Sequence, residues 1–250
     1  MTTKLFNMKT HLGAIVIAVA ILLGFLIMGN AYNYKFKSTE IISVTGLAEK
    51  DFTSDLIVWN GAFIKNGFEL KSAYATLKND ERTIKAYLNS KGIPDSNIVF
   101  SSVNISKNYQ RKYDERGNEI SADFSGYTLA GNVRVESKDI DRVEKLSREI
   151  TELLEQGIEL TSNPPEYYYT QLNTLKIDLL AQASSDSRTR AETIAKNSGG
   201  SLGGIKKATM GVFQITGKNA NEDYSYGGVF NTSSKLKTAS ITMKIDYLVK

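Results

Sequence analysis

An uncharged apolar run from Leu12 to Gly29 constrains this chain more than any other feature of its sequence. Lys4 and Lys9 precede the run, and Lys35 and Lys37 follow it. At about 1.5 Å per residue, a helix of this length reaches about 27 Å, close to the roughly 30 Å hydrocarbon core of a bilayer. The run therefore predicts a helix that crosses a membrane.

The same run has two other readings, a cleaved secretory signal and a buried helix of a soluble protein. A signal needs an apolar stretch of about 7 to 15 residues before a small-x-small cleavage site. Gly29-Asn30-Ala31 is a loose match to such a site, but the run is longer than that range. Tyr32, Tyr34 and Phe36 follow at once, as in the aromatic belt at a membrane surface. We therefore expect an uncleaved anchor, with the cleaved signal as the alternative.

This reading divides the chain into four parts. We expect a short cytoplasmic tail over residues 1–11, the anchor over 12–29, a juxtamembrane linker over 30–40 and a folded domain over 41–250. Two lysines lie on each flank of the run, so only the amino terminus favours this orientation. The expected location is the cytoplasmic membrane with the domain on the periplasmic side, or the periplasm after signal cleavage. Because the chain has no cysteine, a lipid-modified cysteine is not an alternative anchor.

The net charge of +4 does not belong to the folded part of the chain. Of the 31 basic residues, four lysines precede Glu40, so 27 basic residues remain against 27 acidic ones. Binding to a phosphate backbone relies on a clustered excess of lysine and arginine. We therefore expect no nucleic acid partner.

Alternation and helical periodicity predict the elements in the first half of the domain. A short strand at 41–46 and a longer one at 55–65, apolar on both faces, precede a helix from near Phe68 to near Gly92. Strands follow at 99–109 and 126–136, and the polar stretch between them is a hairpin loop or a pair of frayed strand ends. Ser137 is placed to cap a helix that runs to about Gln156.

The second half of the domain contains the strongest helix start signal in the chain. A short strand at 157–162 precedes Asn163-Pro164-Pro165-Glu166, which combines a capping side chain, proline in the first turn and a glutamate three residues after the cap. This signal predicts a helix to about Asn197. Two last strands are expected near 205–216 and 236–249. The Gly-, Asn- and Ser-rich segment 217–234 between them is expected to be an exposed mobile loop or interface arm.

The order of these elements indicates an α+β fold. Strand, helix, strand, strand occurs twice, over residues 55–136 and 157–249, which gives two β-α-β-β-like units. Strands cluster, and helices do not strictly alternate with them. We therefore expect a mainly antiparallel sheet with helices on one face, preceded by one N-terminal transmembrane helix.

Five short motifs span most of the expected domain. They are the strand Ile42–Gly46, the turn Gly92-Ile93-Pro94 with Asn97-Ile98, the strand start Gly126-Tyr127, the helix start Asp139–Val143, and the helix end Arg190–Ala195 before Gly199–Gly203. In this order and spacing they resemble the SIMPL-domain family of bacterial envelope proteins, although Ser54 stands where the family usually has proline. The resemblance implies an extracytoplasmic α+β protein that assembles into large, ring-like homo-oligomers. It supplies no catalytic residues.

The residue types restrict the chemistry that the folded domain can perform. The only histidine, His11, lies at the membrane boundary, and there is no cysteine. Imidazole-dependent nucleophiles and zinc sites therefore lack their residues. A pair of carboxylates, as in glycosidases, is the remaining option, with Glu49, Asp51 and Asp55 as candidates. Short acidic groups more often cap turns, so we expect no catalytic, metal or cofactor site and no enzyme.

Two groups of tyrosines are candidate binding residues. Tyr167, Tyr168 and Tyr169 suit a sugar-stacking platform or an interface hot spot, or more simply one core ring that the others cover. Tyr224 and Tyr226 lie in the expected loop beside glycine and serine, as in an adaptable binding surface. This loop is a candidate contact for an envelope partner or for self-association, and the alternative is ordinary surface exposure.

Three functions fit these observations. The first is a membrane-anchored, extracytoplasmic scaffold that self-assembles into homo-oligomers and has no defined biochemical activity. The second is a module that binds an envelope glycan or peptide through the tyrosines. The third, and least supported, is a carboxylate-dependent hydrolase. We favour the first, with membrane contact through the N-terminal helix.

Overall fold

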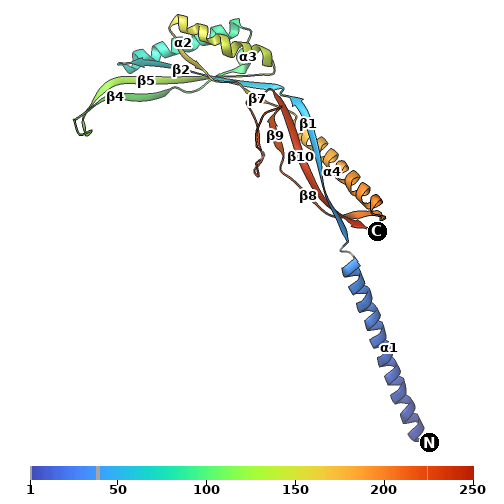
Figure 1. The fold of residues 1–250 in the computed structure, drawn as a ribbon. Coiled ribbons are helices and arrows are strands. Elements are labelled where there is room, and N and C mark those ends of the chain that lie inside the picture. Colours follow the sequence, from blue (N-terminus) through green and yellow to red (C-terminus); the bar gives the residue numbers. More distant parts are fainter. Residues whose placement is uncertain (1, 38–39, 224) are drawn as a thin grey trace. The chain divides into compact units, whose positions relative to one another are not determined.

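The computed structural model describes residues 2–37, 40–223 and 225–250 (Figure 1). Its helices and antiparallel strands confirm the expected α+β class. The strands are divided between two sheets, and the chain forms two compact units. Each unit is described by itself below.

The N-terminal helix α1 (Thr2–Lys37) contains the apolar run. Its segment Gly13–Lys35 has a mean hydropathy of 2.5, and none of that segment is buried inside the protein. The expectation of an apolar helix long enough to cross a membrane is thereby confirmed. The helix continues through most of the segment 30–40 that the sequence suggests as a linker.

Unit 2 (Glu49–Ile177 and Phe213–Ser240) is built on a six-stranded antiparallel sheet. The central strand β2 pairs with β5 on one side and with β6 and β7 on the other. β5 pairs in turn with β3 and β4. The strands are β2 (Leu56–Gly67), β3 (Ile98–Phe100), β4 (Asn104–Tyr113), β5 (Glu119–Ser137), β6 (Glu159–Ser162) and β7 (Glu166–Tyr168).

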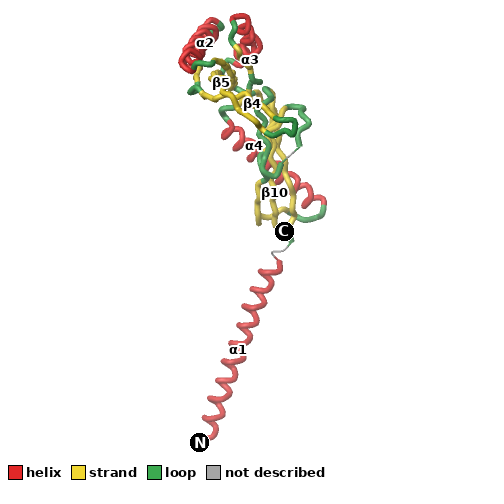
Figure 2. Tube along the Cα trace, turned by 90° about the vertical axis from the view of Figure 1, so that its left-hand side faces the viewer, coloured by secondary structure: helices red, strands yellow, loops and turns green. Residues whose placement is uncertain are grey.

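Two helices, α2 (Leu70–Ser90) and α3 (Ile140–Glu149), cover one face of this sheet (Figure 2). A 3₁₀ helix, η2 (Ile150–Gln156), continues α3, and another, η1 (Asp95–Asn97), follows α2. Each large apolar side chain buried here contributes roughly 1.5–3 kcal/mol, so this core dominates the stability of unit 2. Its members include Trp59, Phe63, Leu77, Ile84, Leu88, Leu129, Val133, Val143, Leu146 and Leu153.

Trp59, the single tryptophan of the chain, lies at the centre of this core. Its indole Nε1 donates to Ser162 Oγ at 2.9 Å, and that hydroxyl donates to the Ser147 carbonyl oxygen at 2.6 Å. The ring lies over Gly61, where an added Cβ would come within 2.6 Å of it. These bonds join β2, β6 and α3 and satisfy the buried indole N–H.

Unit 1 (Met1–Ala48, Asp178–Val212 and Ile241–Lys250) packs α4 (Leu172–Asn197) on a sheet in which β1 (Ile41–Thr53), β10 (Leu236–Val249) and β8 (Leu202–Met210) pair in that order. α4 approaches β1 closely at Gly46, where an added Cβ would lie 2.5 Å from the Ser187 backbone nitrogen. The Leu47 N–H donates to Asp186 Oδ2 at 2.9 Å. The helix therefore lies directly on the strand backbone.

The helix predicted to begin at Asn163 begins instead at Leu172, and this expectation was wrong. Residues 166–168 form β7, whose Tyr167 pairs with Ile57 of β2. The Tyr167 N–H also donates to the Thr232 carbonyl oxygen at 2.7 Å. Tyrosine favours strands, and pairing along β2 outweighs the local capping signal.

One smaller expectation changes, and one pair of alternatives is decided. The helix after β5 is capped by Asp139, whose carboxylate accepts from the Arg142 N–H at 3.2 Å, while Ser137 accepts from the Asp139 N–H at 3.0 Å. The polar stretch between 109 and 126 proves to be two strand ends, joined by a turn in which Asp114 accepts from the Arg116 and Asn118 N–H groups. β4 and β5 are therefore longer than their alternating apolar residues indicate.

Candidate functional site

The described part of the segment 217–234 makes more hydrogen bonds than its composition predicts. β9 (Gln214–Gly217) pairs with β10, and Gln214 reaches across the loop that follows. Its Oε1 accepts from the Val229 N–H at 2.8 Å, and its Nε2 donates to the Ser225 carbonyl oxygen at 2.8 Å. The Ile215 N–H donates to the Val229 carbonyl oxygen at 2.8 Å, and the Ile215 carbonyl oxygen accepts from the Asn231 N–H at 2.9 Å. The expected exposure is confirmed for residues 225–227, while Asn231 at the base of the loop is buried.

A buried lysine holds the base of this loop. Lys237 is 2% exposed, and its ammonium group donates to the Asn231 carbonyl oxygen and, at 3.2 Å, to Asn231 Oδ1. The Asn231 amide donates to Glu222, which also accepts from the Gly217 N–H at 3.2 Å. Burial lowers the pKa of Lys237 to about 8, and the Glu222 carboxylate partly opposes this shift.

Sequence reasoning missed this cluster of Gln214, Glu222, Asn231 and Lys237. One signal was present, because Lys237 occupies the same alternating phase of β10 as Ile241 and Ile245, which are buried. A lysine in the inward phase of a strand needs oxygen partners. The sequence does not show which residue of the loop supplies those oxygens.

The clamped loop presents Tyr226 to solvent. Ser225 and Gly228 close a turn, with the Gly228 N–H donating to the Ser225 carbonyl oxygen at 3.0 Å. Tyr226 lies within this turn and is fully exposed. Phe230, half exposed, lies beside Tyr168 with ring centroids 6.5 Å apart. The other tyrosine proposed for this surface, Tyr224, lies outside the described residues.

The three consecutive tyrosines do not form one stacking surface. Tyr167 packs against the core of unit 2, which confirms that at least one ring belongs to the core. Tyr168, the next residue of the strand, points to the opposite face and donates its hydroxyl to Glu166 at 3.0 Å. Tyr169 packs against Phe52 at 4.9 Å. Burial, followed by the neighbouring glutamates, raises the pKa of Tyr167 and of Tyr168.

The acidic candidates have structural partners. Asp55 accepts from the Thr170 N–H at 2.7 Å and from the Thr170 hydroxyl at 2.6 Å, which holds the chain just before α4. Asp51 contacts Lys218 at 2.8 Å and Thr238 at 2.7 Å, and these two partners lower its pKa. Glu49 is exposed. Asp55 therefore holds a distant turn rather than its own, and Asp51 belongs to an ion pair.

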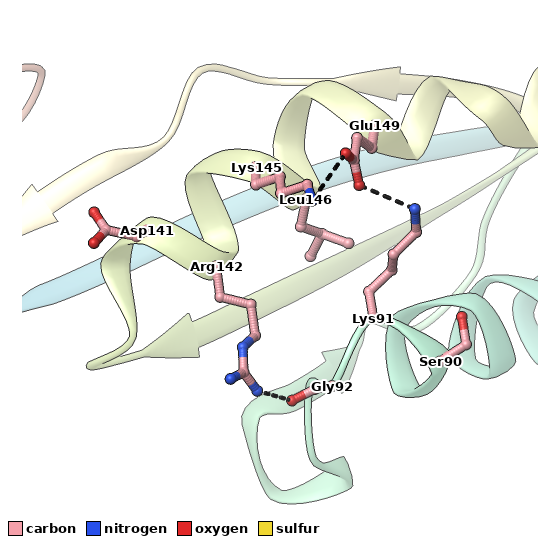
Figure 3. A pocket seen from close by; sticks show the side chains of 8 residues that line it. All are labelled: Ser90, Lys91, Gly92, Asp141, Arg142, Lys145, Leu146 and Glu149. Carbon is pink, nitrogen blue, oxygen red and sulfur yellow. Dashed lines mark hydrogen bonds and ion pairs between the residues drawn. The ribbon is translucent and has the colours of Figure 1, made fainter.

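A pocket of about 580 Å³ lies between the end of α2 and α3 (Figure 3). Lys91 and Glu149 point toward one another across it at 2.9 Å, and Glu149 also contacts Lys145 at 3.6 Å. Arg142 donates to the Gly92 carbonyl oxygen at 2.8 Å. The bond to Glu149 raises the pKa of Lys91, and the reciprocal bond lowers that of Glu149. Lys91, Lys145 and Arg142 each have an oxygen partner already. The contacts of Lys91 and Arg142 across the pocket hold the end of α2 against α3.

The described ranges contain no group of three or more histidine, cysteine, aspartate or glutamate side chains that could hold a metal ion. The arrangement that remains is the hydrogen-bonded turn that carries Tyr226. Such a turn suits contact with a partner, because a preorganised aromatic side chain loses little conformational entropy on binding.

Comparison with known proteins places most of the folded part in one family. A family model described as "SIMPL: Protein of unknown function (DUF541)" matches residues 42–244. No curated protein matches the chain. The matched range includes residues of both compact units and all five of the motifs that resemble this family.

Proposed function

Because the chain belongs to the SIMPL family, we propose that it is a membrane-anchored protein of the bacterial cell envelope, with its folded part on the periplasmic side, which assembles with further copies of itself. We propose a structural rather than an enzymatic role. Asp51 and Asp55, the carboxylates that suggested hydrolysis, are engaged by Lys218, Thr238 and Thr170.

The observation that carries this proposal is the state of α1. The segment Gly13–Lys35 spans 23 residues with a mean hydropathy of 2.5 and is not buried in the protein. At about 1.5 Å per residue it reaches about 35 Å, enough to cross a bilayer with some tilt. Leaving such a surface in water is unfavourable by roughly 25 cal/mol for each Å². A bilayer removes that penalty.

Labelling of single cysteines tests the orientation, because the chain has no cysteine of its own. We expect Tyr226→Cys to react with a membrane-impermeant maleimide in intact spheroplasts. Thr3→Cys, on the other side of the apolar segment, should react only after lysis. Reaction of Tyr226→Cys only after lysis would contradict the periplasmic location. Recovery of a soluble, shortened chain would identify the helix as a cleaved signal.

Sedimentation of the full chain, extracted in mild detergent, tests self-assembly. The protein mass should be a multiple of 27.6 kDa after correction for bound detergent. A monomer at high protein concentration would contradict the scaffold role while leaving the anchor in place.

A second function is favoured by the exposed, clamped Tyr226. Aromatic rings stack on sugars and anchor peptide interfaces, so the loop suits an envelope glycan or peptide. Cosedimentation with purified peptidoglycan tests the glycan. We expect Tyr226→Ser to reduce binding, and Gln214→Ala to reduce it by releasing the turn. Equal binding by Tyr226→Ser and the unchanged chain would remove the loop from consideration.

A further inference from the structure

A two-stranded arm of unit 2 carries an uncovered aromatic cluster. The arm, residues 104–125, consists of β4, the turn after it and the first part of β5, and it projects past α2 and α3 (Figure 1). None of its residues is buried. Among the residues that the structure describes, β4 pairs with β5 alone. The arm therefore has no covering layer within its own unit.

The two faces of the arm differ in character. Successive side chains of a strand point to opposite faces, so Ile105, Tyr109 and Tyr113 share one face of β4. Phe124 of β5 is the register partner of Tyr109, and their ring centroids lie 6.0 Å apart. Phe68 packs against Phe124 at 5.4 Å. We call these five residues the aromatic face.

The opposite face is polar and internally bonded. The Asn108 amide donates to the Thr128 hydroxyl at 2.8 Å, and Lys112 contacts Asp123 at 2.7 Å. Gln110 lies on the same face of β4, as the partner of Asp123. This polar face suits water, whereas the aromatic face does not.

Exposure of the aromatic face is unfavourable for an isolated arm. Phe68 is 71% exposed, Tyr113 57%, Ile105 51%, Tyr109 50% and Phe124 37%. A two-stranded hairpin is at best marginally stable in water without a further layer. A contiguous exposed apolar patch of this kind marks an interaction site.

We propose that the aromatic face is the contact surface between two copies of this chain. This inference rests on the self-assembly proposed above, and it adds the surface that makes the contact. The aromatic face of one copy lies on the aromatic face of the other, and the tips of the two arms point in the same direction. This geometry places β4 of each copy over β5 of its partner.

The distribution of charge favours a second copy in this orientation. On the aromatic face, β4 carries the cations Lys107 and Arg111, and the first part of β5 carries the anion Glu119, which contacts Arg111 of its own copy at 3.0 Å. Lys112 and Asp123 lie on the polar face and take no part in this contact. Stacking β4 over the partner's β5 therefore brings opposite charges together. Pairing β4 edge to edge with a second β4 brings like charges together, which is unfavourable.

The area available also fits a dimer contact. An aromatic side chain presents about 150–250 Å², so five side chains that are about half exposed offer on the order of 500 Å² per copy. A standard interface takes about 800 Å² from each partner. The aliphatic stems of Lys107 and Arg111 on the same face of β4 extend the patch toward that size.

Cross-linking distinguishes the two faces, again using single cysteines. Arg111→Cys lies on the face that carries Tyr109, and Gln110→Cys, its neighbour in β4, lies on the polar face. A short bismaleimide matches the roughly 10 Å between packed sheet faces. In the full chain in detergent, Arg111→Cys should form a covalent dimer and Gln110→Cys should remain monomeric. Equal cross-linking of both would indicate edge-to-edge pairing and overturn the inference.

A pair of matched double variants measures the contribution of the aromatic face. Tyr109→Ser with Phe124→Ser should raise the dissociation constant of self-association at least about tenfold. Gln110→Ala with Ser121→Ala, on the polar face, should leave it unchanged. The fluorescence of Trp59 in the core of unit 2 reports whether each variant folds.

The outcomes separate this inference from the function on which it rests. An oligomeric unchanged chain and a dissociated aromatic-face variant, with Trp59 fluorescence unaltered, would support both. An oligomeric aromatic-face variant would overturn the arm contact and leave self-assembly standing. A monomeric unchanged chain would overturn both.

Discussion

At the scale of single residues, unit 2 shields two lysines from water by different means. Lys65 of β2 has a charged partner, Asp80 of α2, at 3.2 Å and also donates to the Gly157 carbonyl oxygen at 3.3 Å. Lys237 instead donates to the oxygens of Asn231, which are neutral. The two sites should therefore respond differently to substitution.

Lys237 should make the protein more stable as the pH rises above about 8. Its pKa is lowered from 10.5 to about 8 in the folded chain. Between these values the unfolded chain binds the proton and the folded chain does not, so the free energy of unfolding increases with pH in this window. Below it both states are protonated, and the contribution is constant.

Chemical denaturation at pH 7 and pH 10 checks this expectation. The difference in unfolding free energy between the unchanged chain and Lys237→Met should change by about 1–2 kcal/mol in favour of the unchanged chain. Groups common to both proteins cancel in this comparison. An identical pH dependence in the two proteins would show that Lys237 does not titrate differently on folding.

Asp80→Asn should destabilise unit 2 by about 1–3 kcal/mol, because it leaves the half-buried Lys65 without its counter-charge. Asp95→Asn is the matched control, since the Lys85–Asp95 pair at 2.8 Å is exposed, and exposed pairs contribute roughly 0–1 kcal/mol. Urea unfolding monitored at Trp59 measures both. Equal effects would mean that burial of the Lys65–Asp80 pair is unimportant.

At the scale of elements, α4 depends on the absence of a side chain in β1. Gly46→Ala would place a Cβ against the backbone of α4 near Ala183 and Ser187. We expect the helix to be displaced and unit 1 to lose about 2 kcal/mol or more, in the range that overpacking causes. Thermal unfolding followed by circular dichroism measures the loss.

Gly204→Ala provides the control for this substitution. Gly204 lies in β8 of the same sheet, and an added Cβ there would meet nothing within 4 Å. The melting temperature should remain unchanged or rise slightly. If both alanines lowered it equally, the intrinsic preference of the strands, rather than contact with α4, would be responsible.

Periodicity in the sequence predicted most elements, and its failures have one cause. α2 and β10 follow their apolar spacing closely. One face of α2 is buried, and the buried residues of β10 follow the alternation of a strand. The segment 163–168 carried a strong local signal for a helix and became β7. Pairing with β2, which lies about a hundred residues earlier, decided its conformation. Local sequence does not encode such distant pairing.

The candidate site was predicted only in outline. Its exposed tyrosine was found from composition, because loops rich in glycine and serine present aromatic side chains to solvent. Its support by Gln214 and Lys237 was not found. Both side chains act through hydrogen bonds to the backbone of the loop, and backbone acceptors leave no trace in the residue types.

At the scale of the whole molecule, the charge balance of the part from Glu40 onward leads to a prediction about salt. A neutral body has no long-range field to be screened, and the proposed contact is mainly apolar. Raising sodium chloride from 50 to 500 mM should change the dissociation constant of self-association by less than about threefold. Sedimentation of the full chain at both concentrations measures it. Dissociation in high salt would indicate that ion pairs, rather than the aromatic face, hold the copies together.

The way in which the chain is divided between the units has a consequence for synthesis. Unit 1 draws on three separate segments, and its sheet needs Ile241–Val249 between β1 and β8. A ribosome makes β1 some two hundred residues before that strand. Until β10 has been made, β1 and β8 lack the strand that pairs with both of them. Their unpaired edges can then mispair or bind chaperones. The sheet of unit 1 is therefore completed only after Ile241–Val249 has been synthesised.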